Sequence, residues 1–385
     1  MRELLGFEFE KIKKSRTTQG AIIAGLIILA GILFVGYFYS QDYSIQKGNE
    51  KSGFQTDVNE LIRDRYSGDF TDEKVEMIFT DYLKFRQENS KEFYSTPMFY
   101  YQMGQHMFED QIAGVSDQMI SKNEQGKQLT IDEIKIKKVN SLNLKSFGKP
   151  LKIGNYSPWK NLFTVVGQVF ILVNVLVILI CAQIFSGDTS NNINQLLYVT
   201  RYGRSKMNAA KLIAGIKTST LVFIGFQLLT FGLFKLLFDT SGGSSSIQTN
   251  FSIKLFDFPL EWTHWQALFF ILFLQLAGIL FSASVTLLIS AIMQTPMSAF
   301  SCSLGLFFLP YLLTKLFRVG SINDFLRLFP LNFSDPVSTL ARFSSEGFML
   351  NSFTGNILVI FVFLIFSKTI FDLLAYLKMK NWRFA

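Results

Sequence analysis

The sequence predicts an all-α polytopic membrane protein: six transmembrane helices, with a mainly helical extracytoplasmic domain between helices 1 and 2. Three observations predict this fold class. The 385-residue chain is 49% hydrophobic, contains 42 Phe and has a positive mean hydropathy of +0.28. Its apolar residues gather in blocks of about 20, the length that a helix needs to cross the hydrocarbon core of a bilayer. A polar segment of about 120 residues, long enough for a small core, separates the first two blocks.

The ends of the apolar blocks define six spans. The first block follows a cationic stretch, as the core of a signal peptide does. Its apolar run is about 20 residues long and lacks an A-x-A-like cleavage site, so we expect a retained helix. The predicted spans are 20–39, 162–185, 212–238, 265–292, 297–317 and 353–373.

Lys and Arg in the short flanking segments predict the orientation of the spans. Residues 1–19 carry five cations, the loop 186–211 carries four, and the tail 374–385 carries three. With six spans these segments lie on one side together with the short loop 293–296. That side is expected to be the cytoplasm, because cytoplasmic loops carry the excess of Lys and Arg. The Phe-, Ile-, Lys- and Asn-rich composition indicates a bacterial cell membrane.

The segment 40–161 is then extracytoplasmic, and its many cations do not contradict this, because long segments escape the positive-inside rule. A helix is expected after Thr71, a plausible N-cap followed by acidic residues that suit a first turn. The sequence "TIDE" at 130–133 has the capping-box pattern. The alternation in 134–155 allows strands. Apolar residues recur at helical spacing after Thr71: Val75, Ile78, Phe79 and Tyr82.

Three further extracytoplasmic stretches have distinct compositions. The aromatic and Met-rich stretch 97–108 is either a face for a hydrophobic substrate or, the simpler interpretation, a core helix of the small domain. The loop 239–264 contains "TSGGSSSIQTN", which we interpret as a flexible Gly/Ser linker. The loop 318–352 is apolar but interrupted by Pro330 and Pro336, which predicts short helices at the outer interface.

The composition excludes several classes of function. The net charge of +8 comes without a basic, aromatic-interleaved module, so we expect no nucleic acid. No P-loop, G-x-S-x-G or H-E-x-x-H pattern occurs. Two Cys and two His offer neither a disulfide framework nor a histidine metal site. No span carries a charge at its centre, and Lys368 with Asp372 is expected to form a local i, i+4 pair. We expect no catalytic residue, cofactor or metal in this chain.

The inner loop between the second and third spans, within "IFSGDTSNNINQLLYVTRYGRSKMNAAK" (184–211), combines an apolar face with cations. Ile193, Leu196 and Leu197 are spaced i, i+3, i+4 and share one face of a helix. Arg201 and Arg204 can reach acidic groups or helix C-termini on a partner. Gly203 allows the turn that returns the chain to the membrane. On the loop alone, the alternative is that its cations only bind lipid headgroups.

The order of segments resembles the permease subunits of ABC-2 type transporters over nearly the whole chain. The sharpest match is 184–211, where such permeases show an acid after the second span, then Leu-Leu, Gly-Arg and a Lys. Asp188 stands where Glu is usual, and Asn191 and Asn192 stand near a usual Gly. The resemblance implies an interfacial elbow helix over 1–19 and a coupling helix that docks on a separate ATPase. The implied coupling residues are Asp188, Ile193, Leu196, Leu197, Arg201, Tyr202, Gly203, Arg204 and Lys211.

The expected function is therefore that of a permease subunit in an ATP-driven ABC exporter. The substrate is expected to be hydrophobic or amphipathic: a peptide, antibiotic or lipid-like molecule. The expected partners are two ATPase subunits that bind ATP and Mg, a second permease subunit, identical or related, and membrane lipid. The alternative is a non-transporting membrane receptor or immunity protein that binds its ligand through residues 41–160. An intramembrane enzyme is disfavoured, because the residues for its chemistry are missing.

Overall fold

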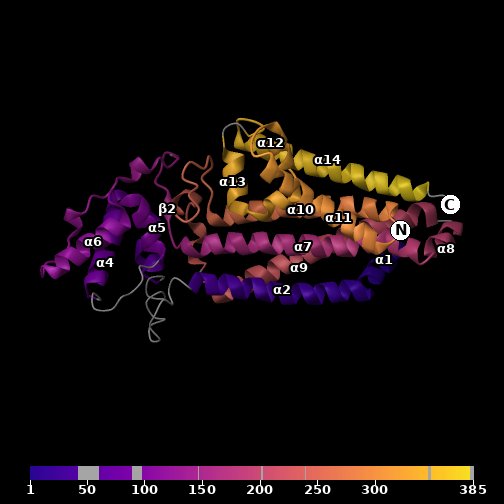
Figure 1. The fold of residues 1–385 in the computed structure, drawn as a ribbon, viewed down its shortest axis with the longest axis horizontal. Helices are drawn as coiled ribbons and strands as arrows, with labels where there is room; N and C mark the ends of the chain where they lie inside the picture. Colours follow the sequence, from indigo (N-terminus) through magenta and orange to yellow (C-terminus); the bar gives the residue numbers. More distant parts are fainter. Residues whose placement is uncertain are drawn as a thin grey trace. The chain divides into compact units, whose positions relative to one another are not determined.

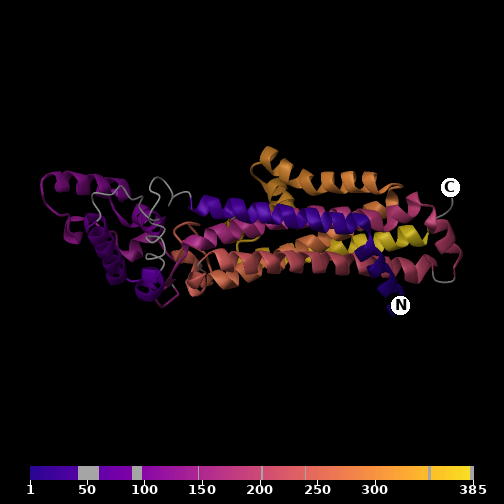
Figure 2. The same ribbon diagram turned by 90° about the horizontal axis from the view of Figure 1, so that it is seen from below.

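The structure, a computed structural model, is built mainly from helices (Figure 1, and turned by 90° in Figure 2). Among the described residues, the two short strands β1 (Gly68–Asp69) and β2 (Lys152–Ile153) pair antiparallel, with Gly68 opposite Ile153. The chain divides into two compact units: Met1–Leu33, Thr164–Leu233 and Phe270–Ala385 form unit 1, and Phe34–Phe163 with Phe234–Phe269 form unit 2. The structure describes residues 1–41, 60–88, 98–145, 147–200, 203–238, 240–345 and 348–381.

Among the described residues, six helices are long and apolar enough to cross a membrane, as the sequence predicted. They fit a multi-pass membrane protein, and each coincides with one predicted span. The second helix is longer than its predicted span at both ends, so residues assigned to the inner loop continue it. The six helices are α2 (Arg16–Gln41), α7 (Ser157–Ser190), α9 (Asn208–Leu237, which continues a π-helical turn from Gly203), α10 (His264–Ile292), α11 (Pro296–Leu316) and α14 (Phe353–Lys380).

Helix α7 is the centre of the helical packing in unit 1. Of its most apolar stretch 72% is buried, compared with 11% for α14, which therefore lies at the periphery. Glycines bring its neighbours close. A Cβ added at Gly25 of α2 would stand 2.7 Å from Leu176 of α7 and 2.9 Å from Phe226 of α9. A Cβ added at Gly215 of α9 would stand 2.9 Å from Ile184 of α7. Small residues at such crossings let helix backbones approach in a membrane.

Short helices follow α11, as the prolines in 318–352 predicted. They are α12 (Ser321–Leu326), the 3₁₀ turn η7 (Pro330–Ser334) and α13 (Pro336–Ser344). A hydrogen bond of 3.1 Å from Gln275 Nε2 of α10 to the Phe333 carbonyl holds this segment. On α7, a Cβ added at Gly167 would stand 1.9 Å from the Ser334 carbonyl oxygen. The segment is therefore packed tightly against both long helices.

Unit 2 contains α4 (Asp72–Glu88), α5 (Met98–Met107) and α6 (Gln111–Glu124) around an aromatic core. The predicted N-cap is confirmed, because Thr71 Oγ1 accepts the Lys74 N–H at 3.3 Å. The predicted apolar positions from Val75 to Tyr82 are buried. The Met-rich stretch is a core helix, since Phe99, Met103 and Met107 of α5 are at most 1% exposed.

One expectation for unit 2 was met only in part, and another was wrong. The alternating stretch 134–155 contributes the short strand β2 and an isolated bridge between Ile136 and Phe108, with the 3₁₀ turn η3 (Val139–Leu142) between them. The Gly/Ser-rich stretch is not a flexible linker: Gly242 and Gly243 are buried, and a Cβ at Gly242 would stand 2.0 Å from the Asn155 carbonyl oxygen. Nearby, Asn250 Nδ2 lies 2.8 Å from His264 Nε2. Small residues here permit close packing, which composition does not distinguish from flexibility.

Candidate functional site

The site predicted between the second and third spans lies in unit 1 and is mostly helical. Helix α7 continues past Asp188 to Ser190, and a separate helix α8 (Ile193–Val199) follows. The chain then enters α9 through a π-helical turn, η4 (Gly203–Met207). The segment is therefore two helix ends with a short helix between them. Two predicted coupling residues, Arg201 and Tyr202, lie outside the described residues.

Asn192 makes the corner between α7 and α8. Its backbone is left-handed, with φ 57° and ψ 16°, a conformation that Asn tolerates better than most residues other than Gly. The Asn192 N–H donates to the Thr189 carbonyl at 3.1 Å. Asn194 Nδ2 donates to Thr189 Oγ1 at 2.7 Å. A left-handed residue at this position explains why Gly or Asn is suited to it.

Helix α8 has an inward and an outward face. Asn194 and Tyr198, spaced i, i+4, are buried. Leu196 is 75% exposed and Val199, three residues later, is 83% exposed. The predicted positions Ile193 and Leu197 are only half-buried. The exposed apolar face therefore consists of Leu196 and Val199. Val199 was not predicted, because the apolar spacing from Ile193 to Leu197 indicated a face one turn earlier in the chain.

Gly203 closes the turn after α8. A Cβ at this position would lie 1.8 Å from the Leu197 carbonyl oxygen, so no side chain fits. Its N–H donates to the Thr200 carbonyl at 3.2 Å. The predicted turn is present, but the φ of Gly203 does not lie in the left-handed region. Close approach of two backbone segments, rather than a left-handed conformation, is what requires glycine here.

The predicted cations of this segment differ in their accessibility. Arg204 and Lys206 are exposed beside α8. The Arg204 guanidinium carbon lies 5.9 Å from the centre of the Tyr198 ring, within the range of a cation–π contact. Burial raises the pKa of Tyr198 to about 12, so the ring is neutral at physiological pH. Lys211 is 1% exposed and cannot meet a partner directly.

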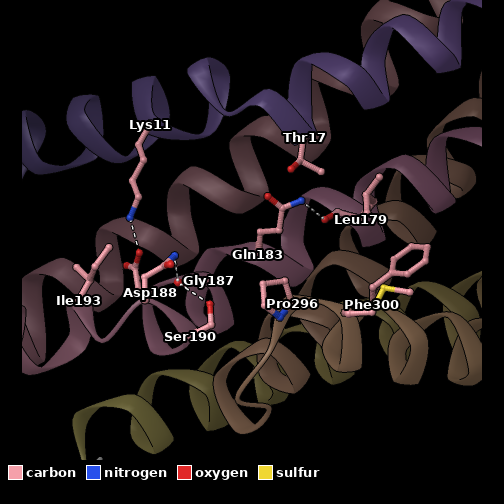
Figure 3. A pocket seen from close by; sticks show the side chains of 12 residues that line it. Lys11, Thr17, Leu179, Gln183, Gly187, Asp188, Ser190, Ile193, Pro296 and Phe300 are labelled. Atoms are coloured by element: carbon pink, nitrogen blue, oxygen red, sulfur yellow. Dashed lines mark hydrogen bonds and ion pairs between the residues drawn. The ribbon is translucent and has the colours of Figure 1, made fainter.

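Lys211 instead belongs to a buried ionic cluster. One oxygen of the Asp188 carboxylate accepts from Lys11 Nζ at 2.6 Å (Figure 3). The other oxygen accepts from Lys211. The Asp188 side chain is 5% exposed and that of Lys11 is 41% exposed. Glu8 is also buried, and desolvation raises its pKa even though Lys211 and Lys11 act in the opposite direction. The predicted coupling residues Asp188 and Lys211 thus form an ion pair with each other and are not exposed to a partner protein.

The N-terminal helix α1 (Arg2–Lys14) supplies two members of this cluster. Its Phe9 ring also receives Lys217 Nζ of α9, 4.5 Å from the ring centre. The sequence predicted α1 as an amphipathic interfacial helix, but not that its residues Glu8 and Lys11 join Asp188. Residues so far apart in the chain leave no periodic signal of their contact. The cluster fastens α1 to the ends of α7 and α9.

A cavity of about 460 Å³ opens beside the cluster, between the start of α2, the end of α7 and the start of α11 (Figure 3). Lys11, Gln183 and Phe300 are among its walls. Within the described ranges, no three His, Cys, Asp or Glu side chains gather in a group that can hold a metal ion. No family model, curated protein or solved structure matches the chain.

Proposed function

We propose that the chain is the permease subunit of an ABC transporter and that α8 docks on a separate ATPase subunit. The observation that carries the proposal is the α8 surface, which we define as Leu196, Val199, Arg204 and Lys206. Two large apolar side chains are exposed on α8, which is none of the six long apolar helices. The two cations lie beside them in the turn η4, at the start of the third of these helices. An apolar patch with a charged rim is typical of a protein interface.

The physics of the α8 surface suits a groove with an apolar floor and an acidic rim. Burying an exposed Leu or Val side chain stabilises a complex by about 1.5–3 kcal/mol. Arg204 can form paired hydrogen bonds with a carboxylate at the rim. The two contributions differ in their salt dependence, since only the charged one is screened.

The buried cluster supports transmission of a movement from α8 to the long helices. Asp188, at the end of α7, is joined to Lys211 of α9 and Lys11 of α1. Separating a buried ion pair leaves an uncompensated charge inside the protein, which costs several kcal/mol. The three helices that the ion pairs join are therefore expected to move together. ATP binding in the partner would draw two ATPase subunits together, and α8 would transmit that displacement to α7 and α9.

The remaining features of the proposal follow from the sequence. The chain has no P-loop, so ATP and Mg are bound by the partner. The cationic flanks favour a bacterial cell membrane with both termini in the cytoplasm and residues 40–161 outside. Six spans resemble half of a pathway, which favours a pair of permeases with two ATPases. Spans without central charges favour export of an amphipathic substrate such as a peptide, antibiotic or lipid-like molecule.

The test is co-purification of the full chain with ATPase subunits from the membranes of the cells that produce it. Leu196→Ser with Val199→Ser removes the apolar contacts and keeps every charge. We expect the dissociation constant to rise by roughly a hundredfold, since ~1.4 kcal/mol corresponds to a factor of ten. Transport and ATPase stimulation should fall with it.

Ile120→Ser, in α6 of unit 2, is the matched control, because Ile120 is also an exposed apolar side chain at 57%. It should leave the complex intact. Failure of any ATPase to bind the unmodified chain, or equal binding by the α8 double variant, would contradict the proposal. Ligand binding to unit 2 in a chain without ATPase partner would instead favour the receptor or immunity protein.

A further inference from the structure

Polar and apolar side chains both line the cavity beside the ionic cluster. Lys11 of α1, Thr17 of α2 and Gln183 of α7 are among the polar ones. Leu179, Phe300 and the exposed Met297 are among the apolar ones, which we call the apolar wall. Its volume of about 460 Å³ lies in the ~300–1,000 Å³ range of small-molecule sites. An occupant must therefore be amphipathic.

The position of the cavity matches the level of lipid headgroups. It lies where α2 begins, α7 ends and α11 begins, and all three helices are long and apolar enough to cross a membrane. Helix α1 runs past it with Phe7 62% exposed and with three lysines in its last turn. Such a helix, apolar on one side and basic on the other, lies in the interface of a bilayer.

The charge of the cavity favours an anion. Two ammonium groups, Lys11 and Lys211, share the single carboxylate of Asp188, and each carboxylate oxygen is already occupied by one of them. The neighbouring Glu8 is 2% exposed and does not line the cavity. Lys211 is enclosed, whereas the Lys11 side chain is 41% exposed and lines the cavity. Lys11 is therefore the ammonium group that an incoming anion meets.

We propose that this cavity binds one anionic phospholipid, with its headgroup phosphate on Lys11 and an acyl chain along Leu179, Phe300 and Met297. The Lys11 ammonium has three N–H donors, and Asp188 accepts one of them. Gln183 and Asn191 add amide groups to the lining, each with one N–H already donated to a backbone carbonyl. The bound lipid would bridge α1, α7 and α11 at the ends of the spans.

The test is native mass spectrometry of the delipidated full-length chain in detergent, titrated with phosphatidylglycerol. Gly187 lines the cavity, and a Cβ added there meets nothing within 4 Å, so Gly187→Phe fills the cavity without removing a charge. We expect it to abolish the one-to-one lipid complex. Lys11→Gln should weaken that complex roughly tenfold, the effect of losing one charge-assisted hydrogen bond.

Matched controls separate the site from general lipid binding. Gly225→Phe places the same side chain at another open helical glycine, on α9, and Lys13→Gln removes another exposed cation of α1. Both should bind phosphatidylglycerol as the unmodified chain does. Equal retention by Gly187→Phe would overturn the proposal.

Two other probes define the ligand. Phosphatidylcholine should bind more weakly than phosphatidylglycerol, and inorganic phosphate alone should neither bind at micromolar concentration nor displace the lipid. Equal affinity for phosphatidylcholine would overturn the anionic headgroup. Displacement of the lipid by an equal concentration of inorganic phosphate would overturn the role of the apolar wall.

Discussion

At the scale of single residues, Asp188 is the charge on which the end of the α7 helix depends. It is 3% exposed and bonded to two lysines, of which Lys211 is 1% exposed. Such a pair contributes little net stability over an apolar pair of the same shape, but loss of one partner leaves an uncompensated buried charge. The cluster therefore acts on specificity: it holds α1, α7 and α9 in one arrangement.

We predict that Asp188→Asn lowers the free energy of unfolding by about 3 kcal/mol, because Lys211 would stay buried without its ion-pair partner. The double variant with Lys211→Met removes both charges and should recover most of this loss. Lys11→Gln alone should cost less, since Lys11 is partly solvated. The stability of the unmodified chain and the three variants is measured by thermal unfolding in detergent, followed by Trp fluorescence. Equal destabilisation by the single and double variants would show that Lys211 does not depend on Asp188.

At the scale of elements, the turn between α8 and α9 is defined by a contact between backbones. Leu197 is near the end of α8, and its carbonyl oxygen occupies the space that a Cβ at Gly203 would need. A larger residue must open the turn and tilt α8. The exposed pair Leu196 and Val199 would then point elsewhere, so Gly203 positions the α8 surface without belonging to it.

Gly203→Ala should therefore destabilise the chain by about 1–3 kcal/mol, the usual cost of forcing an atom into occupied space. Gly225→Ala is the control: its Cβ meets nothing within 4 Å, and Ala in a helix should gain about 0.5–1 kcal/mol over Gly. Limited trypsin digestion adds a local measurement, because an opened turn exposes the bond after Arg204. Unchanged cleavage and stability in Gly203→Ala would contradict the close approach.

The elements differ in how far the sequence could predict them. The six long helices follow from hydropathy alone, because their length and composition are set by the membrane. Helix α4 followed from its N-cap Thr71 and its apolar period. The stretch at Gly242 did not, since Gly and Ser serve both flexible chain and tight packing. Helix α8 was expected, but only the structure distinguishes its buried Tyr198 from its exposed Val199.

At the scale of the whole molecule, contacts between segments far apart in the chain could not be predicted from the sequence. Glu8 and Lys11 belong to a helix predicted to lie on lipid, and Asp188 to a helix end predicted to be a loop. Nothing in their local spacing indicates that they meet, because ionic pairing depends on tertiary packing rather than periodicity. The predicted Lys368–Asp372 pair is confirmed, with 2.6 Å between Lys368 Nζ and Asp372 Oδ2. It could be predicted because both residues lie one turn apart on the same helix.

The number of spans has a consequence for the whole chain that labelling in intact cells can measure. An even number of crossings would put both termini on one side, and the cationic flanks predict that this side is the cytoplasm. In a Cys302→Ser background, whose other cysteine, Cys181, is buried, single cysteines can replace Lys13, Lys127 or Lys380. We expect a membrane-impermeant maleimide to label only the Lys127 position, in unit 2, until the membrane is permeabilised.

The three positions answer different questions. Labelling at Lys380 but not at Lys13 before permeabilisation would mean that an odd number of helices crosses the membrane. Helix α14, the least buried of the six, would then be the first candidate for a helix that does not cross. Labelling at both Lys13 and Lys380 with protection of Lys127 would reverse the orientation and place the α8 surface outside the cell. No ATPase could reach that surface, so this one outcome would contradict the permease proposal even if the fold is correct.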